Sequence, residues 1–333
     1  MTHARLIVDL DALAANYRKF RDSASGGCAA VVKANAYGLG VEPVARRLAA
    51  EGCRQFFVAT DAEGRELRRN LPDAGTFDIF VFSGVVEGRG LIPVVNHPDQ
   101  MRTGPIALHV DTGMHRLGFD GLDAERIPAD TEVRLLMTHL ACADTPDHPL
   151  NEAQLERFEA FAARFPGVPK SIANSAAILT GVEGIGRPGI GLYGGNPFAA
   201  QENPMRCVAT LEGEVLQVRQ VRAGASVGYG ASHVTKRDTT LAVVGIGYAD
   251  GLPRALSNRG QSAFRTIRAP IIGRVSMDLT LVDVTDLPLV APGDWIEFFG
   301  NSVGIDEVAA WADTISYEIL TGVGNRVSRM YVP

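Results

Sequence analysis

Short apolar runs alternate with amphipathic stretches through the first part of the chain. Most of these runs are rich in β-branched or aromatic residues, as buried parallel strands are. Eight runs are strand candidates: Ala29–Val32, Gln55–Ala59, Phe77–Phe82, Leu91–Val95, Ile106–Val110, Val133–Met137, Ser171–Ala173 and Gly189–Tyr193. Eight strands with intervening helices in about 200 residues fit a (β/α)8 barrel better than an open doubly wound sheet.

Two of the intervening stretches have the spacing of amphipathic helices. The apolar side chains that share a helical face are Leu10, Leu13, Ala14, Tyr17 and Phe20 in one stretch, and Leu155, Phe158, Ala162 and Phe165 in the other. Asp9 or Asp11 is placed to cap the first helix, and the second helix begins after Asn151.

Beyond Asn203-Pro204 the pattern changes to strands separated by turn residues. The expected strands are Val208–Arg219, Thr240–Ile246, Ala269–Ile272, Thr280–Val284 and Trp295–Phe299, and the expected helices are Asp306–Ala312 and Ile315–Leu320. We therefore expect an α/β protein with an N-terminal TIM-like barrel over residues 1–205 and a β-rich C-terminal domain over residues 206–333.

Composition narrows the class of protein. Of the 333 residues, 46% are hydrophobic and 21% are charged, as in globular proteins. The net charge of −6 makes binding to a nucleic-acid backbone unfavourable. No apolar run reaches the roughly 18 residues of a membrane span, and the N-terminus lacks the apolar core of a signal peptide. The four cysteines form no CxxC motif, which argues against a zinc site or a disulfide framework. We expect a soluble, cytoplasmic protein that binds neither nucleic acid nor membrane.

Lys33 is the sharpest candidate for chemistry. It directly follows the expected strand Ala29–Val32, at the barrel end where functional residues stand. Partial burial there lowers the pKa of a lysine, which makes the amine nucleophilic and suits it to Schiff-base formation with an aldehyde cofactor. On position alone, a lysine that merely extends to solvent at a strand end is the commoner arrangement.

Other polar residues follow the remaining strands. They are His109, Asp111, Arg116, His139, Asn174, Ser175 and Arg187. We expect the Ser175 hydroxyl and the backbone amides of Gly189-Ile190-Gly191 to form a phosphate cradle, which Tyr37 reaches if a helix begins near Asn35. Arg116 suits a substrate carboxylate because a guanidinium binds one through two hydrogen bonds. Each feature also has a purely structural explanation. The glycines can be ordinary loop residues, Tyr37 can be a packed aromatic ring, and Arg116 can form a surface ion pair.

A set of motifs in fixed order resembles the alanine racemase family of fold-type III pyridoxal-phosphate enzymes. The motifs are Val32-Lys33-Ala34-Asn35-Ala36-Tyr37-Gly38-Leu39-Gly40, Asp111–Gly118, Thr138–Asp144, Asn174-Ser175-Ala176, Arg187–Gly194, Val227-Gly228-Tyr229-Gly230, Gly247-Tyr248-Ala249-Asp250-Gly251 and Gly273-Arg274-Val275-Ser276-Met277-Asp278. They span nearly the whole chain. The resemblance implies pyridoxal 5'-phosphate as cofactor and an N-terminal (β/α)8 barrel with a C-terminal β domain.

The resemblance also implies residue roles. Lys33 would hold the cofactor and act as one proton-transfer base, and Tyr229 would be the second base on the opposite face of the substrate. Racemisation removes the α-proton from one face and returns it to the other, so two positioned bases suit it. Arg187 would contact the pyridine nitrogen, with His139 in the same network. Because arginine cannot accept a proton at working pH, that nitrogen would stay unprotonated.

Further residues complete the implied site. The phosphate would be held by Tyr37, Asn174, Ser175, Gly189 and Ile190. Arg116 and the Met277 backbone would bind the carboxylate of a small amino-acid substrate, with Tyr248 and Asp278 in support. Family members are homodimers with shared active sites, so Tyr229 and Met277 are expected to enter the barrel of the partner subunit.

Two positions depart from the family pattern. His109 stands where many relatives have a lysine that becomes carbamylated and orients the arginine. Asn325 stands where relatives often have a tyrosine that touches the phosphate. The first change puts the positioning of Arg116 in doubt, and the second removes a phosphate contact.

The expected function is interconversion of L- and D-alanine, for peptidoglycan precursors or for D-alanine catabolism. A racemase of broader or serine specificity is the main alternative. A non-catalytic pyridoxal-phosphate-binding homologue fits less well, because such proteins lack the second domain and the second base, whereas Tyr229 is present here.

Overall fold

The computed structural model describes residues 2–71, 76–120 and 123–333. It divides into two compact units. The barrel unit comprises residues Leu13–Ala36 and Gly40–Arg206. The β-rich unit comprises Cys207–Pro333 together with the N-terminal segment through Ala12 and the short piece Tyr37–Leu39.

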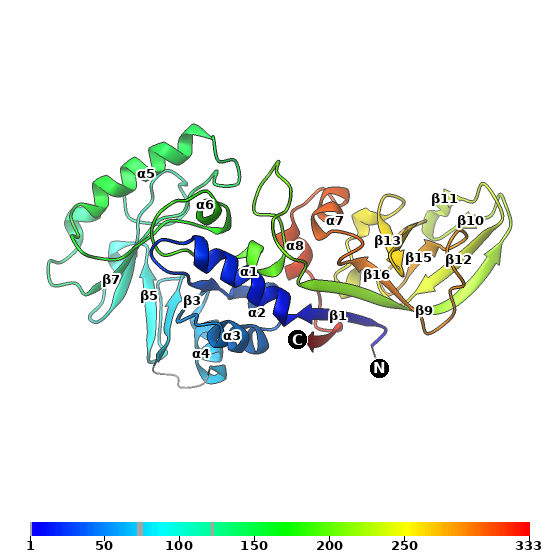
Figure 1. Ribbon diagram of the computed structural model, residues 1–333, viewed down its shortest axis with the longest axis horizontal. Helices are drawn as coiled ribbons and strands as arrows, with labels where there is room; N and C mark the ends of the chain where they lie inside the picture. Colours follow the sequence, from blue (N-terminus) through cyan, green and yellow to red (C-terminus); the bar gives the residue numbers. More distant parts are fainter. Residues whose placement is uncertain (1, 72–75, 121–122) are drawn as a thin grey trace. The chain divides into compact units, whose positions relative to one another are not determined.

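Seven parallel strands in sequence order form the centre of the barrel unit (Figure 1). They are β2 (Ala30–Val31), β3 (Gln55–Val58), β4 (Asp78–Val81), β5 (Leu91–Val95), β6 (Ile106–His109), β7 (Val133–Met137) and β8 (Lys170–Ser171). Nearly all their side chains are buried, as the continuous apolar runs predicted. These strands and the β-rich C-terminal domain confirm the expected fold class.

The expected eighth strand, Gly189–Tyr193, is wrong. Ile190–Tyr193 forms a 3₁₀ helix, η4, that ends at Gly194 in the left-handed conformation. The segment 185–188 joins the sheet edges instead, because Ile185 bonds to the Lys170 carbonyl while Ala29 bonds to the Gly186 carbonyl. Apolar character does not distinguish a buried strand from a buried helical turn, which explains the misassignment.

Helices cover the outside of the parallel strands, with α3 and α4 on one side in Figure 1 and α5 on the other. The helices are α1 (Leu10–Ser23), α2 (Lys33–Tyr37), α3 (Val41–Ala50), α4 (Asp61–Asn70), α5 (Pro149–Ala162) and α6 (Ser175–Leu179), with short 3₁₀ turns η2 (Pro98–Gln100) and η3 (Asp123–Arg126). Asp9 caps α1 by accepting a hydrogen bond from the Ala12 amide at 2.7 Å.

The β-rich unit is built on an eight-stranded sheet with a separate two-stranded ribbon. Its strands are β1 (Ala4–Asp9), β9 (Ala209–Val221), β10 (Ser226–Val227), β11 (His233–Val234), β12 (Thr239–Val244), β13 (Gln261–Phe264), β14 (Ile267–Pro270), β15 (Thr280–Asp283), β16 (Trp295–Phe299) and β17 (Ser328–Val332). Its helices are α7 (Ile305–Trp311) and α8 (Ser316–Thr321), with 3₁₀ turns η5 (Tyr229–Ala231), η6 (Tyr248–Asp250) and η7 (Arg254–Leu256).

The first strand of the chain belongs to this second sheet. β1 pairs antiparallel with β9 and parallel with β17. Its side chains alternate between buried and partly buried, so one face of the strand packs on the core of the β-rich unit.

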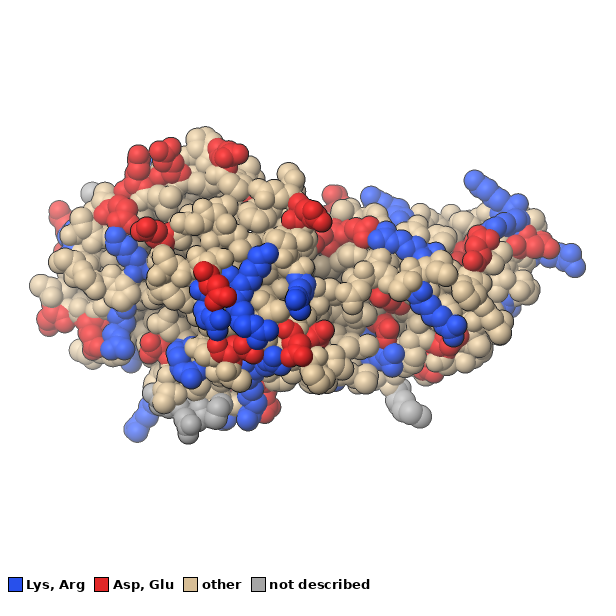
Figure 2. Space-filling view, viewed as in Figure 1, with Lys and Arg blue, Asp and Glu red and all other residues tan. Residues whose placement is uncertain are grey.

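Acidic side chains gather over α5 in Figure 2, where the helix carries Glu152, Glu156 and Glu159. Elsewhere on the drawn face, side chains of both signs are interspersed. No helix among the described residues is long and apolar enough to cross a membrane.

Candidate active site

Lys33 stands at the carboxyl end of β2 and begins an unusual turn. Ala34, Asn35 and Ala36 have φ of 53°, 55° and 53° with ψ near the same values, and Tyr37 has φ 55°. These are left-handed helical angles, which cost an L-residue about 1–2 kcal/mol each. A helical turn thus includes Asn35, the condition set for Tyr37 above, but its hand is opposite to that of an ordinary α-helix.

Hydrogen bonds at both ends hold this turn. The Ala34 amide donates to Glu63 Oε1 at 2.9 Å, and the Val41 amide donates to Asn35 Oδ1 at 2.7 Å. The Ala36 amide bonds to the Val32 carbonyl at 2.9 Å. Such contacts allow a strained backbone to persist, as strained segments at functional sites do.

The Lys33 amine is partly buried. Burial lowers its pKa, nearby Arg116 lowers it further, and Glu63 opposes the shift. The amine also lies 5.7 Å from the centre of the Phe82 ring. A lysine with a lowered pKa is more often neutral and therefore nucleophilic, in agreement with the prediction from its position after the strand.

Arg187 is almost fully buried, with 3% of its surface exposed. Its guanidinium donates to Ser171 Oγ and to the Thr138 carbonyl, both at 2.6 Å. Burial lowers its pKa, but at working pH the guanidinium stays protonated, so it can donate hydrogen bonds and cannot accept them. The side chain is thus a fixed cation at the carboxyl ends of the last strands.

Two histidines lie near these cations. Burial, reinforced by Arg187 and Arg116, lowers the pKa of His139 to about 3 and that of His109 to about 4. Both imidazoles are therefore neutral at physiological pH, and neither adds positive charge to the barrel mouth.

The hydrogen bonds of Asn96 determine the tautomer of His109. Asn96 Nδ2 donates to the carbonyls of Phe82 and Val94 at 2.9 and 2.7 Å. Its Oδ1 is then the acceptor for His109 Nδ1 at 2.8 Å. The proton of His109 is on Nδ1, which leaves Nε2 as a hydrogen-bond acceptor.

Ser175 and the following glycine loop form a cradle of polar atoms. The backbone amides of Gly189 and Gly191 point at Ser175 Oγ at 3.0 and 3.3 Å. A Cβ on Gly191 would lie 2.5 Å from Phe20 Cζ, so the backbone approaches this closely only as glycine. Asn174 instead caps α6 by accepting from the Ala177 amide at 3.1 Å.

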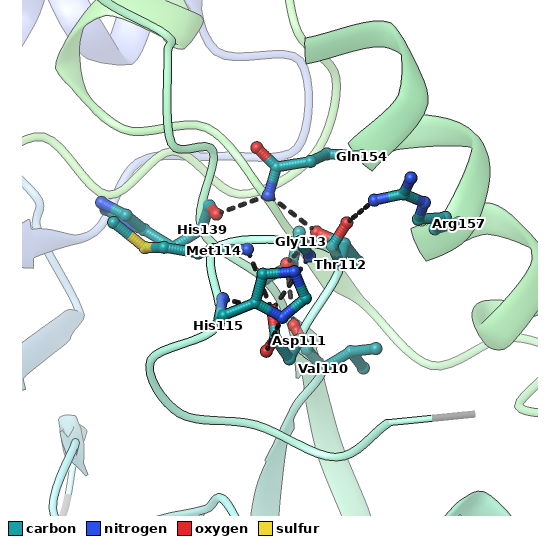
Figure 3. A network of polar contacts seen from close by, with 10 residues as sticks. Val110, Asp111, Thr112, Gly113, Met114, His115, His139, Gln154 and Arg157 are labelled. Carbon is teal, nitrogen blue, oxygen red and sulfur yellow. Dashed lines mark hydrogen bonds and ion pairs between the residues drawn. The ribbon is translucent and has the colours of Figure 1, made fainter. Parts of the chain in front are cut away.

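The loop that carries Arg116 is held by Asp111 (Figure 3). Asp111 Oδ1 accepts from the amides of Gly113, Met114 and His115 at 2.9 to 3.1 Å. Gly118 closes the loop with φ 125°, where a Cβ would lie 2.5 Å from the Asp111 amide. Arg116 itself is exposed on this loop.

Figure 3 also shows that Gln154, on α5, forms hydrogen bonds to the same loop. Its Nε2 donates to Thr112 Oγ1 at 3.0 Å and to the His139 carbonyl at 3.1 Å. Arg157 donates to the Thr112 carbonyl at 2.8 Å. Gln154 therefore joins the loops that follow β6 and β7.

The remaining expected site residues lie in the β-rich unit. Tyr229 starts the turn η5 with 71% of its surface exposed, and Met277 is 52% exposed. The Tyr248 and Ala249 amides bond to the carbonyls of Ser276 and Met277 at 3.0 Å, so these two loops are adjacent. Asp278 pairs with Arg326 at 2.8 Å, and the neighbouring Asn325 is exposed.

Tyr37 packs in the β-rich unit against Tyr317, with ring centres 6.0 Å apart. Burial raises the pKa of Tyr37, so its hydroxyl stays protonated and can donate.

Two residues of the barrel mouth, Glu63 and Asn96, are not among those predicted from the sequence. Asn96 directly follows β5, so the rule that found Lys33 and His139 also reaches it. Glu63 is the third residue of α4 in the pattern Thr60-x-x-Glu63, which signals a helix capping box and gives no sign of the contact with Ala34.

The donor set fits pyridoxal phosphate. The cofactor needs an amine, a cradle for a phosphate dianion and a partner for the ring nitrogen. Lys33 supplies the amine, the Ser175 hydroxyl with two glycine amides supplies the cradle, and Arg187 supplies a buried donor. No cluster of metal ligands occurs within residues 2–71, 76–120 and 123–333.

Comparisons with known proteins cover both units. Residues 8–197 match the family model of the alanine racemase N-terminal domain, and residues 208–331 match that of the C-terminal domain. The alanine racemase of Rhodospirillum rubrum is 48% identical, over 98% of this chain and 96% of the relative.

Other relatives include both biosynthetic and catabolic alanine racemases. A biosynthetic alanine racemase of Agrobacterium fabrum is 43% identical over 98% of this chain and 93% of its own. A catabolic alanine racemase of Rhizobium johnstonii is 44% identical over 98% of this chain and 94% of its own.

Among solved structures, the alanine racemase of Bartonella henselae with covalently bound pyridoxal phosphate is 36% identical. It superposes with a TM-score of 0.92 and complete coverage of both chains. The chain therefore belongs to the alanine racemase family, enzymes that use pyridoxal phosphate to interconvert the two enantiomers of alanine.

Proposed function

We propose that this chain racemises alanine with two bases, Lys33 of one subunit and Tyr229 of the partner subunit. The observation that supports this most directly is the partly buried Lys33 amine, whose pKa is lowered by burial and by Arg116. A base must give up its proton near working pH to accept another from the substrate. Exposed lysines do not meet that requirement.

Bound pyridoxal phosphate supplies an electron-withdrawing ring that weakens the bond between the substrate α-carbon and its hydrogen. The residues proposed to hold its phosphate are Tyr37, Asn174, Ser175, Gly189 and Ile190. Arg187 would donate to the ring nitrogen. Since a guanidinium cannot hand over a proton, this contact limits how far the ring withdraws electrons and disfavours side reactions.

The substrate carboxylate is assigned to Arg116 and the backbone of Met277. Arg116 is exposed on a loop that hydrogen bonds of Asp111 and Gln154 hold in place, so the guanidinium can bind an anion without a large rearrangement. The neutral His139 and His109 leave Arg116 and Arg187 as the cations that meet the anionic substrate and cofactor.

Tyr229 takes the second face of the substrate in this proposal. Its ring projects from a turn with most of its surface exposed, where a second copy of the chain can contact it. The active protein would then be a homodimer with two shared sites, the expected closed symmetry for such exchange.

Mixing two inactive variants tests the shared site. Lys33→Ala and Tyr229→Ala homodimers should each be nearly inactive. After random reassociation of equal amounts, about half of the dimers are hybrids with one intact site, so activity should return to about a quarter of wild type. A tagged chain verifies subunit exchange. No recovery despite exchange would reject the interchain site.

Substrate choice is tested by α-proton exchange across a panel of amino acids. Alanine should exchange fastest. Faster exchange of serine would support the alternative of a racemase with different specificity, whereas the two-base assignment would stand.

A further inference from the structure

Glu63 joins the ends of two neighbouring barrel strands through the two oxygens of one carboxylate. Oε1 accepts from the Ala34 amide at 2.9 Å, just beyond β2. Oε2 accepts from the Ala59 amide at 2.7 Å and the Thr60 amide at 3.3 Å, just beyond β3. A capping box at the start of α4 accounts for the contact with Thr60 only. The bonds to Ala34 and Ala59 need a separate explanation.

The bond to Ala34 reaches the peptide group next to Lys33. The Ala34 N–H belongs to the peptide that links Lys33 to Ala34, and Ala34 is the first left-handed residue of the turn. Left-handed residues revert to ordinary angles unless neighbouring groups hold them. The carboxylate of Glu63 therefore restrains the backbone at the point where the Lys33 side chain departs.

The charge of Glu63 also distinguishes it from its neighbours. Arg116, on the loop after β6, disfavours the ammonium form of Lys33, whereas Glu63, on α4, favours it. His139, after β7, is neutral and carries no charge toward the amine at physiological pH. Glu63 and Arg116 thus act in opposite directions on the same group.

We propose that Glu63 is a positioning residue for Lys33: its carboxylate holds the Lys33–Ala34 peptide in place and offsets the charge of Arg116 at the amine. This inference rests on the proposed role of Lys33 as the lysine that holds the cofactor. It assigns no contact of Glu63 with substrate or cofactor.

Titration of Lys33 tests the electrostatic part. Full-length chain freed of pyridoxal phosphate is methylated with formaldehyde and cyanoborohydride at a series of pH values, and the Lys33 peptide is quantified by mass spectrometry. Glu63→Gln removes the charge and keeps an acceptor oxygen. We expect its methylation curve for Lys33 to shift to lower pH, because the group that favours the ammonium form is gone.

Thr60→Ala is the matched control. Thr60 Oγ1 accepts from the Glu63 amide at 3.3 Å, so its loss weakens the same helix cap and leaves the carboxylate in place. We expect the methylation curve of Lys33 in Thr60→Ala to coincide with that of wild type. Equal shifts in both variants would mean that helix stability, rather than the Glu63 charge, determines the titration of Lys33, and would overturn the proposal.

Hydrogen exchange at the Ala34 amide tests the geometric part. Glu63→Ala removes the acceptor, so exchange at Ala34 should be about tenfold faster, while Thr60→Ala should exchange as wild type does. Unchanged exchange in Glu63→Ala would overturn the proposed positioning. If Glu63→Ala does not fold, the titration of Glu63→Gln still decides the proposal.

A separate experiment tests the proposed function, so that its failure can be distinguished from failure of the inference on Glu63. Borohydride reduction of wild-type protein loaded with pyridoxal phosphate should attach the cofactor to Lys33. Attachment to another lysine would reject the role of Lys33 regardless of Glu63. Attachment to Lys33 with an unshifted Glu63→Gln titration would reject the inference on Glu63 alone.

Discussion

Lys33 and Arg187 lie in the barrel unit among other cations and aromatic rings, whereas Tyr229 and Met277 lie on loops of the β-rich unit with most of their surface exposed. Burial and charge already change the pKa values of the first group within one chain. Tyr229, by contrast, has 71% of its surface facing solvent. The barrel unit thus surrounds its candidate groups within one chain, whereas the proposed role of Tyr229 depends on a second copy of the chain, and the variants below test that contrast.

Lys33→Ala should have the largest effect. Removing the amine should abolish the visible absorbance of attached pyridoxal phosphate and nearly all racemisation, because both depend on that nitrogen. Absorbance and optical rotation measure the two losses. Lys19→Ala, at an exposed lysine, is the control and should retain both. Retained absorbance in Lys33→Ala would place the cofactor elsewhere.

Tyr229→Phe should follow, with racemisation reduced by about 10²–10⁴-fold, as for a positioned acid–base group. Cofactor absorbance should remain, since the barrel unit is unchanged. Tyr331→Phe removes a hydroxyl that bonds to the Leu39 carbonyl in the same unit, and should stay close to wild-type rate. Similar losses in both variants would point to stability of the β-rich unit and remove Tyr229 from the mechanism.

Arg187→Glu should slow racemisation less than Tyr229→Phe does, and should change which product forms. A carboxylate at this position would stabilise the protonated form of the ring nitrogen and strengthen the electron sink, which favours transamination. Pyruvate release per racemisation event measures the change. Arg237→Glu reverses a charge that is half exposed and paired with Asp286, and should leave the product ratio unaltered. An unaltered ratio in Arg187→Glu would separate this residue from the ring.

Sequence patterns predicted the buried strands better than the backbone of the turn that follows Lys33. Leu91–Val95 is a strand with the predicted ends and is buried throughout, because a continuous apolar run indicates a buried strand well. The left-handed turn after Lys33 could not be predicted, since Ala34 and Ala36 have no local preference for positive φ. Its angles are held by contacts such as that with Glu63, which lies 29 residues away in the sequence, and no local pattern encodes such a contact.

Asn96 and β1 were missed for other reasons. Asn96 satisfied the positional rule but carries no charge or nucleophile, so chemistry did not single it out. The segment Ala4–Asp9 is short and pairs with strands near the other end of the sequence, and such distant pairing leaves no local signal beyond alternation. The roles of the exposed Tyr229 and Met277 came from family resemblance, because exposure alone does not indicate function.

The smallest predicted effect concerns acid stability of the barrel unit. Burial, Arg187 and Arg116 lower the pKa of His109 from 6.5 to about 4. As pH falls through 6.5 the unfolded chain takes up a proton at this residue, but the folded chain does not until about pH 4. Stability is therefore lost through this window as pH falls.

His109→Gln removes this proton uptake while keeping a side chain that can donate to Asn96 Oδ1. Between pH 6.5 and 5, we expect the variant to lose about 2 kcal/mol less unfolding free energy than wild type does. Urea unfolding at several pH values and a fixed pyridoxal phosphate concentration measures the difference. His139, with a pKa lowered in the same direction, stays in both proteins, so the variant should retain part of the pH dependence. Parallel plots of unfolding free energy against pH for the two proteins would show that His109 has the same pKa in the folded and the unfolded chain. The barrel mouth would then lack the buried, cationic surroundings that distinguish it from the exposed loops around Tyr229.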